Sequence, residues 1–197
     1  MAASANFAWA NRQAIAHFTR KSFEKIFGSG VELRVVYDVA HNIAKRERHR
    51  LPDAPPEMER EVLVHRKGAT RSFPAGSPFI PEAYKKFGQP VLIPGSMGTA
   101  SYVLVGTDRA MEETFGTVCH GAGRAMSRTA AKKGRDARVE TKKLEDRGIF
   151  QRAETRDGIL EEVPEAYKDI DAVVDVVHQA GLARKVARLK PIGVIKG

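Results

Sequence analysis

The chain is organised around one segment, Phe115-Gly116-Thr117-Val118-Cys119-His120-Gly121-Ala122-Gly123-Arg124-Ala125-Met126-Ser127-Arg128. His120 stands at the start of a turn of small residues, and the pattern predicts a helix over about residues 123–133. Glycines let a ligand approach the backbone closely, and the N–H groups of a helix N-terminus bind phosphate. On such a helix Arg124 and Arg128 would share one face and reach the same anion. The segment therefore predicts a phosphate site with His120 as proton carrier or nucleophile; the alternative is a helix cap beside a structural histidine.

The composition of the chain is that of a folded protein with a basic surface. Of its 197 residues 42% are hydrophobic and 29% are charged, and the formal net charge is +9. Such a charge favours a polyanionic partner, usually nucleic acid. The single cysteine excludes an internal disulfide and fits a reducing compartment. Because the sequence has neither an apolar run of about 18 residues nor a signal-peptide pattern, we expect a cytoplasmic protein outside any membrane.

Helical and strand patterns alternate along the chain without a βαβ rhythm, which predicts an α+β fold. Helices are expected over residues 1–27, over the charged residues 132–148, and within residues 161–181. Strands are expected over residues 31–37, 61–65, 90–93, 101–106, 186–189 and 194–196. Residues 46–60 are charged and contain prolines, so they are expected to form an exposed loop. The first helix should end at Gly28, and its hydrophobic residues Phe7, Ala14, Ile15, Phe18 and Ile26 recur near helical spacing.

Three further loops have residues that suit ligand binding. His41-Asn42 follows a predicted strand, where a histidine is either a metal ligand or a hydrogen-bonded structural residue. Residues 67–71 place two cations around Gly-Ala-Thr, which suits phosphate but also an ordinary basic turn. Residues 95–101 offer hydroxyls and glycine amides to a base or a phosphate, although they match neither the P-loop nor the dinucleotide pattern.

The remaining histidines and the cysteine are weaker candidates for chemistry. His17 and His178 lie in helical patterns and His49 lies in the charged loop, so all three are interpreted as structural or surface residues. His65 adjoins the basic loop and could orient a neighbour. Cys119 has no second thiol with which to form a metal or redox pair.

Longer motifs extend over essentially the whole chain in a fixed order. They are Ala5-Asn6-Phe7-Ala8-Trp9-Ala10-Asn11-Arg12, His41-Asn42-x-Ala44-Lys45-x-Glu47, His65-Arg66-Lys67-Gly68-Ala69-Thr70-Arg71, Gly95-Ser96-Met97-Gly98-Thr99-Ala100-Ser101-Tyr102, Cys119-His120-Gly121-Ala122-Gly123-Arg124-x-Met126-Ser127-Arg128, Glu161-Glu162-x-Pro164-x-Ala166-Tyr167-Lys168-Asp169 and Val194-Ile195-Lys196-Gly197. Together they resemble the RtcB family of RNA-splicing ligases.

The resemblance implies a ligase that joins RNA ends bearing a 2′,3′-cyclic phosphate or 3′-phosphate to a 5′-hydroxyl, using GTP and manganese, as in tRNA splicing and RNA repair. In that family a histidine becomes guanylylated, GMP passes to the RNA 3′-phosphate, and the 5′-hydroxyl then attacks and releases GMP. A neutral imidazole that attacks an α-phosphate needs cations and amides to spread the developing charge. Two manganese ions would polarise the phosphoryl oxygens.

The resemblance also assigns roles to single residues. His120 matches the guanylylated nucleophile and His41 matches a metal ligand. Tyr167 and Lys196 resemble residues near the guanine. Residues that match the other guanylate contacts are Asn42, Pro94, Gly95, Ser96, Met97, Ser101, Gly121, Ala122 and Gly123. Cations that suit the path of the RNA phosphates or the triphosphate are Lys67, Arg71, Arg124 and Arg128.

The resemblance covers only the C-terminal part of the family's single catalytic domain, over residues 1–197. Full-length members carry an N-terminal half whose Asp, Cys and His residues complete a dinuclear metal site, so that half is an expected partner, in cis or in trans. Three alternatives remain open: a non-catalytic RNA-binding remnant, one subunit of a split ligase, and a nucleotide-binding metalloprotein that acts on something other than RNA. The presence of His120 and Lys196 favours a ligase, since a decayed remnant need not keep them.

Overall fold

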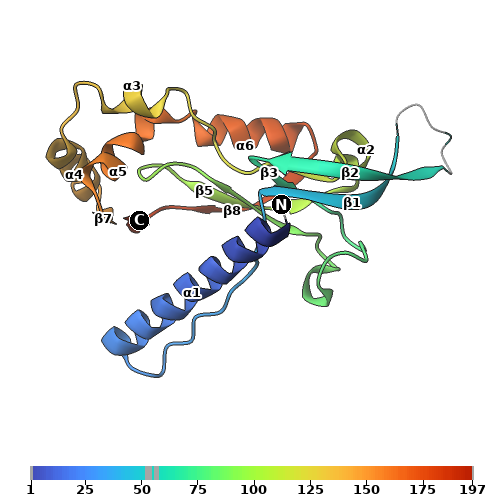
Figure 1. Cartoon of the computed structure of the whole chain (residues 1–197), viewed down its shortest axis with the longest axis horizontal. Coiled ribbons are helices and arrows are strands. Elements are labelled where there is room, and N and C mark those ends of the chain that lie inside the picture. Colours follow the sequence, from blue (N-terminus) through green and yellow to red (C-terminus); the bar gives the residue numbers. More distant parts are fainter. Residues whose placement is uncertain (1, 52–54, 56–57, 197) are drawn as a thin grey trace. The chain divides into compact units, whose positions relative to one another are not determined.

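The computed structural model describes residues 2–51, 55 and 58–196. The chain divides into two compact units, Met1–Thr70 and Arg71–Gly197, and each is described by itself. Helices and short, mostly antiparallel strands alternate along the chain (Figure 1), so the α+β prediction is confirmed. The single catalytic domain implied by the resemblance stays a prediction. No helix of the described residues is long and apolar enough to cross a membrane.

The first unit begins with a long helix, α1 (Ala2–Phe27), as the sequence predicts. Gly28 ends it in the left-handed region (φ 83°), and its N–H donates to the Glu24 carbonyl at 2.9 Å. None of the residues Ala2–Phe27, all of them described, is buried. Phe7, Phe18 and Ile26 are among its exposed hydrophobic side chains.

An antiparallel hairpin completes the first unit. Its strands are β1 (Asn42–Arg50) and β2 (Glu59–Lys67), paired from Asn42↔Lys67 to Arg50↔Glu59. The exposed loop predicted over residues 46–60 is therefore wrong at both ends, which belong to β1 and β2. The strand predicted over residues 31–37 is also wrong, because those residues have no regular structure. Ion pairs across the hairpin offset the charge of its strands, from Arg46 to Glu61 at 3.1 Å and from Arg48 to Glu59 at 3.4 Å. Two of the loop's three prolines, Pro52 and Pro56, lie outside the described residues.

His49 belongs to the hairpin rather than to a loop, which corrects the prediction. Its side chain is buried, and Nε2 lies 2.9 Å from Glu47 Oε2. The same carboxylate accepts two hydrogen bonds from the buried Arg66 guanidinium, each 2.8 Å long. A buried ion needs such partners, so His49 is structural, as expected, although it is not on the surface.

The second unit is built on a three-stranded antiparallel sheet in the order β4 (Pro90–Pro94), β5 (Ser101–Gly106), β8 (Ala183–Leu189). The predicted strands at 90–93, 101–106 and 186–189 lie in these elements. Helix α6 (Ile170–Gln179) packs on the sheet and contacts β8 (Figure 1). The largest core cluster joins them through Val91, Ile93, Leu104, Val174 and Ala183.

Two of the other predicted helices are shorter than expected, and the helix expected within residues 161–181 is confirmed as α6. The helix expected over residues 123–133 shrinks to α3 (Arg128–Lys132), and residues 132–148 contain α4 (Ala137–Glu145), separated from α3 by Gly134 at φ 72°. Helix α5 (Arg156–Glu161) ends at the first residue of the segment 161–181. A 3-10 turn, η2 (Pro164–Ala166), follows it, and then helix α6. The remaining elements are β3 (Ala69–Arg71), η1 (Glu82–Tyr84), α2 (Asp108–Thr114), β6 (Thr117–Cys119), β7 (Phe150–Ala153) and β9 (Gly193–Lys196). Strand β9, predicted at 194–196, pairs in parallel with β7.

Candidate functional site

His120 follows the last residue of β6 and is half-buried. Beyond it the chain forms a loop rather than a helix, because Gly123 adopts φ 73° and α3 starts only at Arg128. The predicted helix N-terminus beside His120 is therefore wrong. The loop is fixed at Ala122, whose N–H donates to the Pro94 carbonyl at 3.1 Å and whose side chain lies in the core. Any phosphate near His120 would meet loop amides, not a helix end.

The 94–101 loop, which joins β4 to β5, lies against the loop that carries His120. Its ends, Pro94 and Ser101, are paired in the sheet. Inside the loop Ser96 N donates to Thr99 Oγ1 at 2.7 Å, and the two hydroxyl oxygens lie 3.0 Å apart. A Cβ on Gly95 would lie 2.3 Å from the Ala100 carbonyl oxygen, so the compact form needs glycine there.

Gly121 brings the two loops close together. A Cβ at this position would lie 3.4 Å from the Pro94 carbonyl oxygen, in van der Waals contact. The structure thus brings together two of the segments that the sequence assigns to guanylate. The N–H groups of Ser96, Thr99 and Ala122 are bonded within these two loops.

Tyr167 is fixed beside the same loops by Arg124. The two residues form an isolated antiparallel β-bridge, and the Lys168 N–H donates to the Gly123 carbonyl at 3.0 Å. The Arg124 guanidinium lies 5.0 Å from the centre of the Tyr167 ring, and Nη1 donates to the phenol oxygen at 3.2 Å. The phenol in turn donates to Glu162 at 2.5 Å. Tyr167 therefore sits in a polar network that fixes its ring.

The environment of Arg124 argues against the phosphate role that the sequence predicts. Its Nε donates to the Met126 carbonyl at 3.1 Å and its Nη2 to the Glu161 carbonyl at 2.7 Å, in addition to its contacts with Glu162 and Tyr167. A guanidinium engaged in this way holds protein segments together. Arg128 differs, because its side chain is 70% exposed and its Nε lies 3.5 Å from a carboxylate oxygen of Glu161. The shared helix face predicted for the two arginines is wrong, since Arg124 lies before α3.

Burial changes the pKa of two groups near His120. Desolvation raises the pKa of Tyr167, and the hydrogen bond to Glu162 raises it further. Desolvation likewise raises the pKa of Cys119 above its usual value. Both groups are therefore neutral at pH 7, and the Cys119 thiol is a poor nucleophile, in agreement with the sequence.

Lys196 ends strand β9, in register with Ala153 of β7. Two residues earlier, Val194 packs against a cluster that contains Met97 of the 94–101 loop with Leu144 and Ile149. The backbone of the predicted guanine residue is thereby linked through packing to the predicted guanylate loop. Sequence distance alone gave no sign of this proximity.

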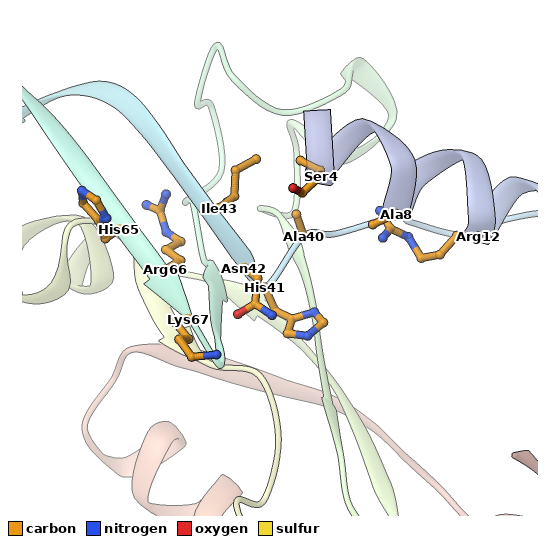
Figure 2. A pocket seen from close by; sticks show the side chains of 11 residues that line it. Ser4, Ala8, Arg12, Ala40, His41, Asn42, Ile43, His65, Arg66 and Lys67 are labelled. Atoms are coloured by element: carbon orange, nitrogen blue, oxygen red, sulfur yellow. The ribbon is translucent and has the colours of Figure 1, made fainter. Parts of the chain in front are cut away.

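The first unit contains its own candidate site, an open pocket of about 660 Å³ between α1 and the hairpin. Figure 2 shows His41, Asn42 and Lys67 together at one end of the hairpin, with Arg12 reaching in from α1. The His41 carbonyl accepts a hydrogen bond from the Gly68 N–H at 2.9 Å, which closes the hairpin end. The structure thus brings together three predicted site residues at this pocket, all of them polar or cationic.

Arg12 is a residue of this pocket that the sequence analysis did not select. Its Nε donates to Asp38 at 2.7 Å, while its Nη2 is buried and has no hydrogen-bond partner among the residues that the structure describes. An N–H of this kind favours a ligand acceptor, and an anion above all. Its place at the end of the motif that begins at Ala5 was the available signal.

Of the other predicted cations, Arg71 does not line this pocket. Arg71 is the last residue of β3, and its guanidinium stacks 5.0 Å from the centre of the Phe73 ring. Lys67 is exposed at the end of β2. The described part of the chain has no group of three or more His, Cys, Asp or Glu residues that could hold a metal ion. His41 by itself is therefore an incomplete metal site.

Comparison with known proteins identifies the family. The family model described as tRNA-splicing ligase RtcB matches residues 1–197. The chain is similar to the tRNA-splicing ligase RtcB of Archaeoglobus fulgidus, at 56% identity over 200 residues, and to that of Thermococcus kodakarensis, at 56% over 201 residues. The protein of the same name from Nanoarchaeum equitans is 54% identical over 200 residues. Each comparison covers 100% of this chain but only 41% of the relative. On these grounds the chain belongs to the RtcB family and spans about two fifths of the length of these relatives.

Proposed function

We propose that this chain is the part of a cytoplasmic RNA ligase that carries the nucleophile and binds the nucleotide. The ligase would use GTP to join an RNA 2′,3′-cyclic phosphate or 3′-phosphate end to a 5′-hydroxyl end, in tRNA splicing or RNA repair. One observation carries the proposal: His120 stands in a loop whose Ala122 N–H is bonded to the 94–101 loop at Pro94, with Tyr167 held at its other side. The names of the relatives support the reaction class.

The chemistry begins with the imidazole of His120. Its nitrogen attacks the α-phosphorus of GTP, a P–N bond forms, the bond between that phosphorus and the bridging oxygen breaks, and pyrophosphate leaves. An oxygen of the RNA 3′-phosphate then attacks the same phosphorus and releases the imidazole. Finally the 5′-hydroxyl attacks the activated 3′-phosphorus, GMP leaves, and the hydroxyl proton passes to solvent. Amides of the 94–101 and 120–123 loops suit the charge that develops on the phosphoryl oxygens.

The guanine would lie near Tyr167, whose ring is fixed by Arg124 and Glu162. A fixed ring loses little entropy when a base stacks on it, which favours binding. Lys196 would contribute from β9, while Asn42 of the first unit matches another of the family's guanylate contacts. These assignments rest on the motif match.

Manganese does not fit the described residues as a complete site, since His41 is a single ligand and a divalent ion in a mixed site needs several. We propose that His41 supplies one ligand and that the rest of the ligase supplies the others. The exposed apolar side chains of α1, such as Phe7, Phe18 and Ile26, support a partner segment of this kind, because a patch of this type usually marks an interface.

The RNA would bind mainly through cations. Arg128 and Lys67 are exposed, and Arg12 lines the pocket of the first unit. Arg124 is left out of this set, because its donors are used within the protein. The net charge of +9 is in keeping with a nucleic-acid partner.

The test is covalent labelling of the assembled ligase, made by joining this chain to the remainder of the Archaeoglobus fulgidus relative. Incubation with α-labelled GTP and manganese should give an adduct that is stable to alkali and labile to acid, as a phosphoramidate is. His120→Ala should abolish the label, while His178→Ala, an exposed histidine of α6, should keep it. Absence of label on the unchanged ligase, or label retained by His120→Ala, would overturn the proposal.

A further inference from the structure

We infer that Arg147 is a positioning residue that fixes the 94–101 loop for nucleotide binding; the inference rests on the proposed function. Its Nη2 donates to the Gly98 carbonyl at 2.6 Å. Gly98 is buried at the middle of the loop. A bond from a cation to a carbonyl is shorter and stronger than one between neutral groups, so this contact sets the direction of the Gly98 peptide.

The hydrogen bonds inside the 94–101 loop do not fix the position of Gly98, so a group outside the loop must do so. Thr99 N donates to the Ser96 carbonyl at 3.3 Å, and the Thr99 hydroxyl accepts from Ser96 N at 2.7 Å. These bonds close the loop on itself but do not connect it to the rest of the unit. The ends are connected by the sheet pairing of Pro94 and Ser101. The hydrogen bond from Arg147 to the Gly98 carbonyl connects the middle of the loop to the rest of the unit.

Arg147 is held in a rigid turn at the end of α4. Its own N–H donates to the Leu144 carbonyl at 3.0 Å, and the Ile149 N–H donates to the same carbonyl at 2.9 Å. Gly148 makes the turn possible with φ 75°. Leu144 and Ile149 are buried against Met97 of the loop. Because packing and hydrogen bonding anchor both sides, a shift of the guanidinium would move the loop with it.

The guanidinium also lies directly over Gly98. A Cβ built on Gly98 would stand 3.1 Å from Arg147 Nη1 and 2.7 Å from Pro164 Cγ. Arg147 therefore contacts the loop at Gly98, whereas the Ala122 N–H donates to the loop at its first residue, Pro94. His120 belongs to the loop that contains Ala122. Loss of the Arg147 bond should consequently impair nucleotide binding and leave the intrinsic reactivity of His120 unchanged.

The experiment measures guanylylation of the assembled ligase at varied GTP concentration. Arg147→Met should raise the KM for GTP by roughly ten- to hundred-fold, the effect of one charge-assisted hydrogen bond, with little change in kcat. Arg147→Lys keeps a donor, so its KM for GTP should lie between those of the unchanged ligase and Arg147→Met. For Arg147→Ala, added guanidinium at low concentration should lower the KM again. Arg138→Met, which changes an exposed arginine at the other end of α4, is the matched control and should leave KM unchanged.

A second measurement keeps the inference separate from the proposed function. Hydrogen exchange of the assembled ligase should become faster in the peptide that spans residues 94–101 on Arg147→Met, with no change in β5 or α6. If the unchanged ligase takes no label, the proposed function fails, and exchange still tests the positioning. Unchanged KM and unchanged exchange would overturn the inference. A loss of kcat alone, or an equal increase of exchange throughout the unit, would overturn it as well.

Discussion

Arg124 and Arg128 are four residues apart, yet their guanidiniums have opposite environments. Arg124 bonds to two carbonyls, a carboxylate and a phenol, and Arg128 has one long contact to Glu161. Arg124→Met should therefore lower the free energy of unfolding by about 1–3 kcal/mol, because Glu162 and two carbonyls lose a charged donor. Arg128→Met should change it by less than about 1 kcal/mol, as is usual for an exposed ion pair. Urea unfolding of the assembled ligase, followed by circular dichroism, measures both.

Equal losses of stability for the two variants would contradict this difference between them. A further readout is the Tyr167 ring, since Arg124 is its stacking partner. Fluorescence or ultraviolet absorbance of Tyr167 should change in Arg124→Met and stay the same in Arg128→Met. Sequence alone could not separate these residues, because spacing on an assumed helix gave both the same role.

At the scale of elements, the 94–101 loop is enclosed on its outer side by α4 and η2. Gly98→Ala would place a Cβ 2.7 Å from Pro164 Cγ and 3.1 Å from Leu144 Cδ2. Overpacking of this kind should lower the free energy of unfolding by about 1–3 kcal/mol and weaken GTP binding. Gly30→Ala is the control, because a Cβ there meets no atom within 4 Å. Thermal unfolding and a GTP titration check the prediction; a Gly98→Ala protein with unchanged stability and affinity would refute it.

The sequence predicted the elements best where local pattern decides the structure. Strands β4 and β5 and helix α1 follow hydrophobic runs and periodicity. The helix expected over residues 123–133 failed because a distant partner decides that backbone: Arg124 pairs with Tyr167 as a β-bridge. The hairpin was missed because its charges resemble a loop, while ion pairs from one strand to the other stabilise it. The periodicity of α1 also did not indicate whether its hydrophobic side chains would be buried.

For the candidate site, the motifs predicted which residues to examine but not how they are held. Ala122 bonds to Pro94, which no spacing rule gives, since 28 positions of sequence separate the two residues. The role of Arg147 was hidden for the same reason, because it acts through a backbone carbonyl of a distant loop. Arg12 was recognised only as the last residue of the motif that begins at Ala5. Contacts between segments far apart in the chain need the fold.

At the scale of the whole molecule, the described residues do not form a complete metal site by themselves. Its described residues include no group of three or more potential metal ligands. The purified 197-residue chain should therefore fail to join 3′-phosphate and 5′-hydroxyl RNA ends with GTP and manganese, and the assembled ligase should join them. A gel assay with end-labelled RNA measures the joined product. Efficient joining by the chain alone would mean that its own residues suffice.

The last prediction concerns how the net charge of +9 acts on RNA. If defined cations grip phosphates, binding releases counterions and the affinity falls as salt rises. Arg128 is exposed and only loosely paired, so its guanidinium can turn toward a phosphate and bind it with two parallel bonds. Arg128→Ala should weaken RNA binding by about 1–3 kcal/mol and reduce the salt slope by about one phosphate contact.

The matched control changes two lysines of α4 that already have acidic partners. Lys142 lies 2.6 Å from Asp146, and Lys143 lies 2.9 Å from Glu140. Replacing both by methionine removes two positive charges but no free phosphate ligand, so RNA affinity should fall less than in Arg128→Ala. Filter binding of the assembled ligase at several salt concentrations compares the two variants. If the double lysine change weakens binding as much as the arginine change, the charge acts diffusely and Arg128 has no special place, since net charge alone would then decide the affinity.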